Sequence, residues 1–296
     1  MKKQESLITE KESGVVYSLV SVLPYLIMFL GVLALMFIDK DYANKTYYTY
    51  ISYLTPLVAS FGVLTYVCVR KKSNPLAVCS VKKCNPIYIL IGVTLIIGLL
   101  FGVGYFNELF VGVLEKAGLK FNTPNLPNAN AMQLVLNILI IGVLAPTLEE
   151  LVFRGVILNG LKGLKTYQTV LLCGVLFALF HQNPAQLIYQ AIVGGCLTYL
   201  TLKAGSVVPS IVAHLVNNIF IIITSVYFSG VEFYNAVTIT VGVALFALSL
   251  IGIYLLSKKN KTPAQNGTPF NKRGYYMSVV VGVVFNIVLI VSTLFI

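Results

Sequence analysis

The sequence predicts an all-α membrane protein, a polytopic bundle of about nine transmembrane helices, with eight as the other possible count. Of its 296 residues, 57% are hydrophobic and only 10% are charged, whereas about 25% of residues in soluble domains are charged. The mean hydropathy is +0.86. Apolar runs of about 20 residues, the length that crosses a bilayer as a helix, recur along the chain. This composition excludes a soluble globular domain.

The expected helices follow the apolar runs in order. They cover residues 14–38, 50–69, 87–106, 131–158, 168–181, 185–202, 207–228, 235–256 and 277–296. The first run has no small-residue cleavage site, which favours a helix over a signal peptide. The third contains Gly98-x-x-x-Gly102, a spacing typical of close helix packing. Residues 107–120 are amphipathic and are expected to lie along the membrane surface, before Pro124 and Pro127 break the chain.

Basic residues fall mainly in alternate loops. With the N-terminus inside, 16 of the 21 lysines and arginines lie in inside segments: Lys2, Lys3, Lys11, Arg70, Lys71, Lys72, Lys82, Lys83, Lys162, Lys165, Lys203, Lys258, Lys259, Lys261, Lys272 and Arg273. Such an asymmetry indicates a multi-pass protein of the cell membrane with a cytoplasmic N-terminus and an outside C-terminus. This distribution of basic residues also explains the net charge of +11, so no nucleic-acid partner is expected. The expected partner of the helices is membrane lipid.

The five cysteines are Cys68, Cys79, Cys84, Cys173 and Cys196. Cys79 and Cys84 share a lysine-rich loop, and no second pair at a matching spacing would complete a zinc site. We expect all five to be free thiols, with the loop facing a reducing cytosol.

Two adjacent glutamates interrupt the apolar run 131–158. A charge at the centre of a bilayer costs about 2.5–3.5 kcal/mol on insertion scales, so such residues usually serve a function. Glu150 and Arg154 are four residues apart and can pair on one helix face. Glu149 points about 100° away and is left free for chemistry. This stretch alone is equally consistent with a purely structural ion pair.

The only two histidines of the chain, His181 and His214, also lie in apolar segments, and Asn218 follows His214 by one helical turn. A single buried histidine is usually a core residue, but two histidines together with a buried acid indicate a functional site. Helix lengths place these side chains and Glu149 at similar depths, with access from the cytoplasmic side expected. A water between Glu149 and His181 could attack a carbonyl, with His214 and Asn218 donating to the oxyanion. Pro146 is expected to kink the helix and open a cavity there.

Three motifs in order resemble the signature of the CPBP family, which contains CAAX prenyl proteases and the Abi bacteriocin-processing or immunity proteins. The motifs are Glu149-Glu150-x-x-x-Arg154, Phe177-x-x-x-His181 and His214-x-x-x-Asn218. The resemblance covers about residues 130–225, so the expected organisation is N-terminal membrane helices with an amphipathic loop over 1–129, a catalytic core over 130–225, and C-terminal membrane helices over 226–296.

This resemblance implies an intramembrane endopeptidase that cuts a membrane-associated or prenylated peptide or protein; a bacteriocin, a pheromone or another small peptide is the favoured substrate. By position, Glu149 and His181 would activate water, and His214 and Asn218 would form the oxyanion hole. Glu150 and Arg154 would support their geometry.

No metal or other cofactor is expected, because there is no HExxH motif and Asn218 is a poor zinc ligand. The alternative is a divalent metal such as zinc held by Glu149, His181 and His214. Two other functions stay open. One is a non-catalytic membrane partner or immunity protein that regulates a sensor kinase or a bacteriocin target. The other is a transporter, since buried acids and histidines also build proton relays, although no inverted repeat is evident.

Overall fold

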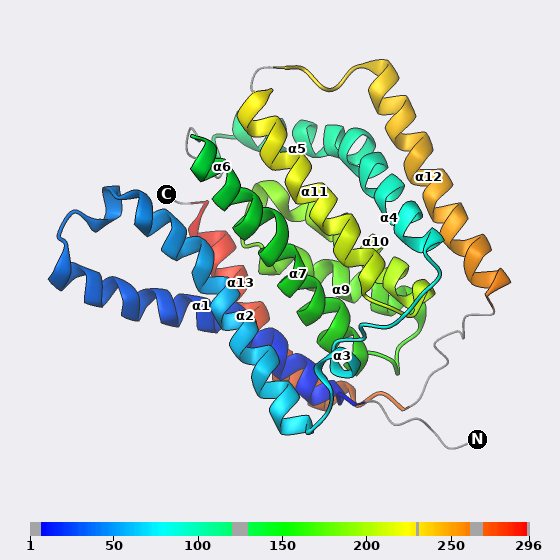
Figure 1. Ribbon diagram of the computed structural model, residues 1–296, viewed down its shortest axis with the longest axis horizontal. Coiled ribbons are helices and arrows are strands. Elements are labelled where there is room, and N and C mark those ends of the chain that lie inside the picture. Colours follow the sequence, from blue (N-terminus) through cyan, green and yellow to red (C-terminus); the bar gives the residue numbers. More distant parts are fainter. Residues whose placement is uncertain (1–6, 120–129, 229–230, 261–268, 295–296) are drawn as a thin grey trace.

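Helices and their connections make up the structure, a computed structural model that describes residues 7–119, 130–228, 231–260 and 269–294 (Figure 1). No strand occurs within these ranges. Eight of their helices are long and apolar enough to cross a membrane: α1 (Glu10–Ile38), α2 (Thr46–Lys71), Ile87–Lys116, Ala131–Gly160, Pro184–Ala204, α11 (Val208–Tyr227), α12 (Ala236–Lys259) and α13 (Lys272–Ser292). The expected all-α multi-pass bundle is confirmed.

A ninth apolar helix, α9 (Thr166–Phe180), has only 15 residues. At 1.5 Å per residue it is about 22 Å long, less than the ~30 Å hydrocarbon core. A helix of this length that begins at one surface therefore ends inside the membrane. α9 packs extensively against α10 (Leu187–Ala204), and the tip of this helical hairpin carries His181.

The first and last helices lie side by side and run in the same direction. Ser18 Oγ donates to the carbonyl of Ser278 over 2.7 Å and accepts from the Gly282 N–H over 3.0 Å, while Ser21 bonds Asn286 further along both helices. The first and last spans are therefore parallel, with their backbones held together along much of their length.

The third span is longer than the sequence indicated. α4 (Ile87–Gly98), a π-helical segment (Leu99–Val103) and α5 (Gly104–Lys116) form one continuous helix, which changes direction in Figure 1. The expected loop from residue 107 is therefore helical as far as residue 116, and its placement along the membrane surface stays a prediction. The Gly98-x-x-x-Gly102 face packs on α12 so closely that a Cβ on Gly102 would lie 2.8 Å from the Val243 nitrogen. Pro124 and Pro127 lie outside the described residues.

The helix that carries the glutamates alternates between α and π geometry: α6 (Ala131–Asn137), π-helical Ile138–Leu144, α7 (Ala145–Glu150), π-helical Leu151–Ile157 and α8 (Leu158–Gly160). Pro146 has no N–H to donate one turn back, and the preceding Ala145 N–H instead reaches the carbonyl of Ile140. The disruption expected at Pro146 thus takes the form of a wider π-helical turn within a continuous helix. Such turns are frequent at functional sites.

Buried apolar side chains form two groups. One joins α1, α2, α9 and α13 to the glutamate helix, and the other joins α4, α10, α11 and α12. The glutamate helix also contacts α11, so the polar residues singled out above lie between the two groups.

Candidate active site

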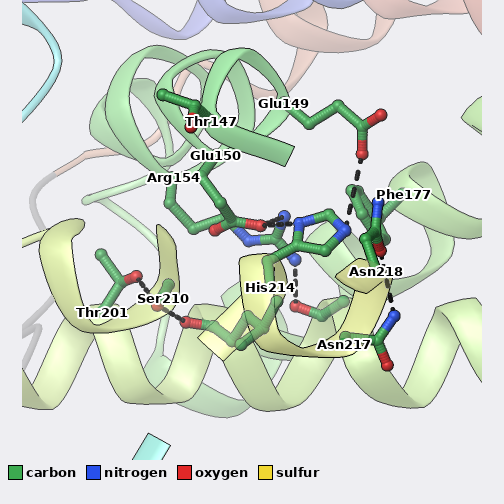
Figure 2. A network of polar contacts seen from close by, with 12 residues as sticks. Thr147, Glu149, Glu150, Arg154, Phe177, Thr201, Ser210, His214, Asn217 and Asn218 are labelled. Carbon is green, nitrogen blue, oxygen red and sulfur yellow. Dashed lines mark hydrogen bonds and ion pairs between the residues drawn. The ribbon is translucent and has the colours of Figure 1, made fainter. Parts of the chain in front are cut away.

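A carboxylate, a guanidinium and an imidazole meet in the interior of the bundle (Figure 2). Arg154 Nη1 donates to Glu150 Oε1 over 2.7 Å, and the same oxygen lies 2.9 Å from His214 Nδ1. Glu150, Arg154 and His214 are 0%, 1% and 2% exposed. The ion pair indicated by the four-residue spacing is therefore present, and the contact with His214 extends it from the glutamate helix to α11.

Arg154 has partners on three helices, although its buried Nε has no hydrogen-bond partner among the described residues. Its Nη2 donates to the carbonyl of Gly194 in α10 over 2.9 Å. Its guanidinium carbon lies 4.3 Å from the centre of the Phe177 ring of α9, within the range of a cation–π contact. A buried charge without such partners would be strongly unfavourable. Arg154 therefore links the glutamate helix, α9 and α10 around the site.

Glu149 faces a different environment from its neighbour. Its side chain is 20% exposed, and its Oε2 lies 3.9 Å from His214 Nε2, which is too long for a direct hydrogen bond. Glu149 and His181 line one cavity of about 350 Å³. The sequence predicted this division, in which one glutamate is paired and sealed and the other is free.

His181 forms the C-terminal cap of α9, where the helix stops. Its Nδ1 lies 2.8 Å from the carbonyl oxygen of Phe177. Because a carbonyl can only accept, Nδ1 carries the proton in this hydrogen bond, and Nε2 of a neutral ring is left to accept another. The Phe177 ring lies 4.6 Å from the His181 ring and 5.8 Å from the His214 ring, so it spaces the two imidazoles.

Asn218 lies one turn beyond His214 on α11, at the edge of this cluster in Figure 2. Its Nδ2 donates to the carbonyl of Ile141 over 3.0 Å, and its Oδ1 accepts from Asn217 Nδ2 over 3.1 Å. Asn217 is held in turn by the Tyr189 hydroxyl at 3.0 Å. Asn218 and His214 are not among the residues that line the cavity with Glu149 and His181. His214 is buried with its Nε2 3.9 Å from the cavity-lining Glu149, and Asn218 is partly exposed.

The rest of the cavity wall comes from α1, α2 and the end of α9. It consists of Val20, Ser21, Pro24, Tyr25, Met28, Ser52, Thr55, Pro56, Phe180 and Gln182. The α2 residues belong to the first half of that helix, near its connection to α1 and far from the lysine-rich segment 70–83. The cavity therefore lies between α1, α2 and the end of α9, beside the half of α2 that is remote from the lysine-rich segment, and access from the cytoplasmic side stays a prediction.

Sequence reasoning did not identify the α1 and α2 residues that face Glu149, nor the Gly194 carbonyl that holds Arg154. Neither has a sequence signal, because both contacts join segments far apart in the chain. Asn217, adjacent to a motif residue, was visible in the sequence but was not singled out.

A metal ion bound by Glu149, His181 and His214 is the alternative role for these side chains. Among the residues that the structure describes, no three His, Cys, Asp or Glu side chains are placed to hold a metal ion. As placed, Glu149, His181 and His214 therefore do not fit a three-ligand zinc site, and no catalytic step is derived through one.

Comparison with known proteins adds one finding. Residues 131–220 match a family model described as Rce1-like, type II CAAX prenyl endopeptidase, and this segment contains all seven residues named in the three motifs. No curated protein and no solved structure matches the chain. The chain is therefore a multi-pass membrane protein, and its segment 131–220 is similar to the CAAX-type prenyl endopeptidases that this family model describes.

Proposed function

We propose that the protein is an intramembrane endopeptidase that hydrolyses a peptide bond in a membrane-associated or prenylated peptide or protein. The observation that carries this proposal is the pairing of Glu149 and His181 on one cavity, while the adjacent Glu150 is sealed in an ion pair. One carboxylate is thus available to a reacting water, and the other serves to hold the site.

In the proposed step, Glu149 accepts a proton from a water molecule whose oxygen attacks the peptide carbonyl carbon. The free Nε2 of His181 accepts the second hydrogen of that water and orients its lone pair. The tetrahedral intermediate then collapses, the C–N bond breaks, and Glu149 returns its proton to the leaving amine. General-base catalysis of this kind typically contributes about 10²–10⁴-fold to the rate.

His214 is proposed to stabilise the negative oxygen of the tetrahedral intermediate. Glu150 accepts from Nδ1–H, so Nε2 can donate only when the ring is protonated. The second N–H of Asn218, not used by Ile141, is the other proposed donor after a modest side-chain movement.

The cavity wall indicates what kind of peptide the site accepts. Apart from Glu149 and His181, it carries only apolar, hydroxyl, thioether and amide side chains. An anionic substrate side chain would have no counter-ion there, and a cationic one would pair only with Glu149, the proposed base. We therefore propose an uncharged, unwound segment as the substrate, which reaches Glu149 from the lipid between α1 and α2.

The test compares the termini of membrane peptides in cells that carry wild type, Glu149→Gln or Glu115→Gln at equal expression. Glu115 is an exposed glutamate of α5 and serves as the matched control. New termini present with wild type and Glu115→Gln, and absent with Glu149→Gln, are expected and would name the substrate. Identical termini in all three, with full complementation of a deletion by Glu149→Gln, would favour the non-catalytic partner or immunity protein.

A further inference from the structure

The residue after His181 has an unusual backbone. Gln182 adopts φ +52°, the left-handed region that a non-glycine residue occupies only when its surroundings hold it there. Its N–H still bonds the carbonyl of Leu179 over 3.1 Å. The chain therefore turns away from the axis of α9 directly after the imidazole that lines the cavity.

The Gln182 side chain is held by two helices from outside the matched segment. Its Oε1 accepts from the Tyr25 hydroxyl of α1, and its Nε2 donates to Asn286 Oδ1 of α13 over 2.7 Å. Both ends of the amide are thus occupied, which fixes the side chain and, through it, the left-handed turn.

Asn286 is fully buried and uses its amide completely. Its Nδ2 donates to Tyr17 OH over 2.9 Å and to Ser21 Oγ over 3.0 Å. The Tyr17 hydroxyl donates onward to the carbonyl of Leu176 in α9 over 3.1 Å. The hydrogen bonds therefore form a closed circuit that leaves α9 at Leu176 and returns at Gln182. His181 lies between these two anchor points. The inner part of the network, Asn286 with Tyr17 and Ser21, is fully buried and hydrogen-bonded, and such a network is rigid.

The two outer helices provide a stiff base for this circuit. A Cβ on Gly282 of α13 would lie 2.8 Å from the Ser18 Cα of α1, so the backbones are in direct contact. Ser18 also bonds α13 twice, as described above. Movement of α13 relative to α1 would therefore break several contacts at once.

We propose that Gln182 and Asn286 are positioning residues that set the orientation of the His181 imidazole in the cavity. α13, which lies outside the family-matched segment 131–220, is then part of the framework of the active site and not merely a peripheral span. The effect expected on catalysis rests on the proposed function, whereas the effect expected on the orientation of the His181 ring does not.

The experiment uses the fact that the chain has only two histidines. The full-length protein is labelled with ¹⁵N-histidine in detergent micelles, and the ring signals of His181 and His214 are assigned with single His→Gln variants. Gln182→Gly removes the amide while relieving the left-handed backbone, so this variant should fold. Asn286→Leu removes the opposite anchor. The matched control is Ser249→Ala, which removes a buried contact between α12 and α4, the 3.0 Å pair with Thr94.

In Gln182→Gly and Asn286→Leu, we expect the His181 ring signals to shift or broaden while those of His214, held by Glu150, stay unchanged. Ser249→Ala should change neither. On a cleaved peptide, kcat should fall on the order of 10- to 100-fold, as for a small misplacement of a catalytic group, with KM little changed.

An unchanged His181 signal in a folded Gln182→Gly protein would overturn the proposal. If Asn286→Leu fails to fold, Tyr25→Phe, which removes a single hydroxyl, serves in its place and should perturb His181 in the same direction. A His181 response without any cleavage by the wild type would uphold the placement of the ring by α13 and overturn the proposed function alone.

Discussion

The buried ion pair gives the sharpest prediction about stability. Arg154→Met keeps an unbranched apolar side chain against the Phe177 ring but removes the cation. Glu150, which is fully buried, would then keep His214 as its only polar partner. The Gly194 carbonyl would still accept a hydrogen bond from Thr198 Oγ1 at 2.8 Å. The destabilisation therefore comes mainly from the Glu150 carboxylate, which loses its cationic partner.

Removing one member of a buried pair typically costs about 3–5 kcal/mol, because the other charge stays buried without compensation. We expect Arg154→Met to lower the free energy of unfolding by about this amount. In the double variant Glu150→Gln/Arg154→Met neither charge remains. Its cost should therefore fall short of the sum of the two single costs by about 1–3 kcal/mol, the range seen for residues in one network.

The assay is reversible unfolding in mixed detergent micelles, with Lys71→Met as the matched control. Lys71 pairs with Glu12 at 2.6 Å, but both side chains are partly exposed, at 21% and 26%, and such pairs contribute about 0–1 kcal/mol. Proteolytic activity should be lost in the double variant as well, because Glu150 also holds His214. An Arg154→Met cost no larger than that of Lys71→Met would refute this account of the buried charge.

Three further outcomes are expected. Asn218→Ala should lower kcat more than it raises KM, because an oxyanion donor acts in the transition state; steady-state kinetics showing a pure KM effect would contradict that role. Membrane-impermeant maleimide should label Cys84 only after permeabilisation, and Cys79 scarcely at all, because burial raises the pKa of the Cys79 thiol to about 12; rapid labelling of Cys84 in intact cells would overturn the topology. Gly155→Ala should destabilise the fold by about 1–3 kcal/mol, since the new Cβ would lie 2.8 Å from the Cys79 carbonyl oxygen. A Gly155→Ala free energy of unfolding equal to that of the wild type would contradict this packing.

The features that the sequence predicted well depend on residues that are close together in the chain. The Glu150–Arg154 pair follows from a spacing of four residues, which helix geometry converts directly into contact. The number and class of the helices follow from the length of the apolar runs. The three motifs also indicated which helices would meet, and the match to residues 131–220 agrees with the family they suggested.

What the sequence did not predict depends on tertiary packing. The contact between Glu150 and His214 joins residues 64 positions apart, and the one between Gln182 and Asn286 joins residues 104 apart. No periodicity marks either pair. The segment after residue 106, expected as a loop between spans, is helical as far as residue 116 and continues the third span through a π-helical turn.

The central claim is that Glu149 acts as the base for a water in the cavity it shares with His181. The most direct test is single-turnover cleavage in proteoliposomes, using the peptide identified by the new termini, with wild type, Glu149→Gln and Glu115→Gln. We predict that Glu149→Gln stays folded and loses about 10²–10⁴-fold in rate, while Glu115→Gln cleaves like wild type. Cleavage by folded Glu149→Gln within a few-fold of wild type would contradict the account.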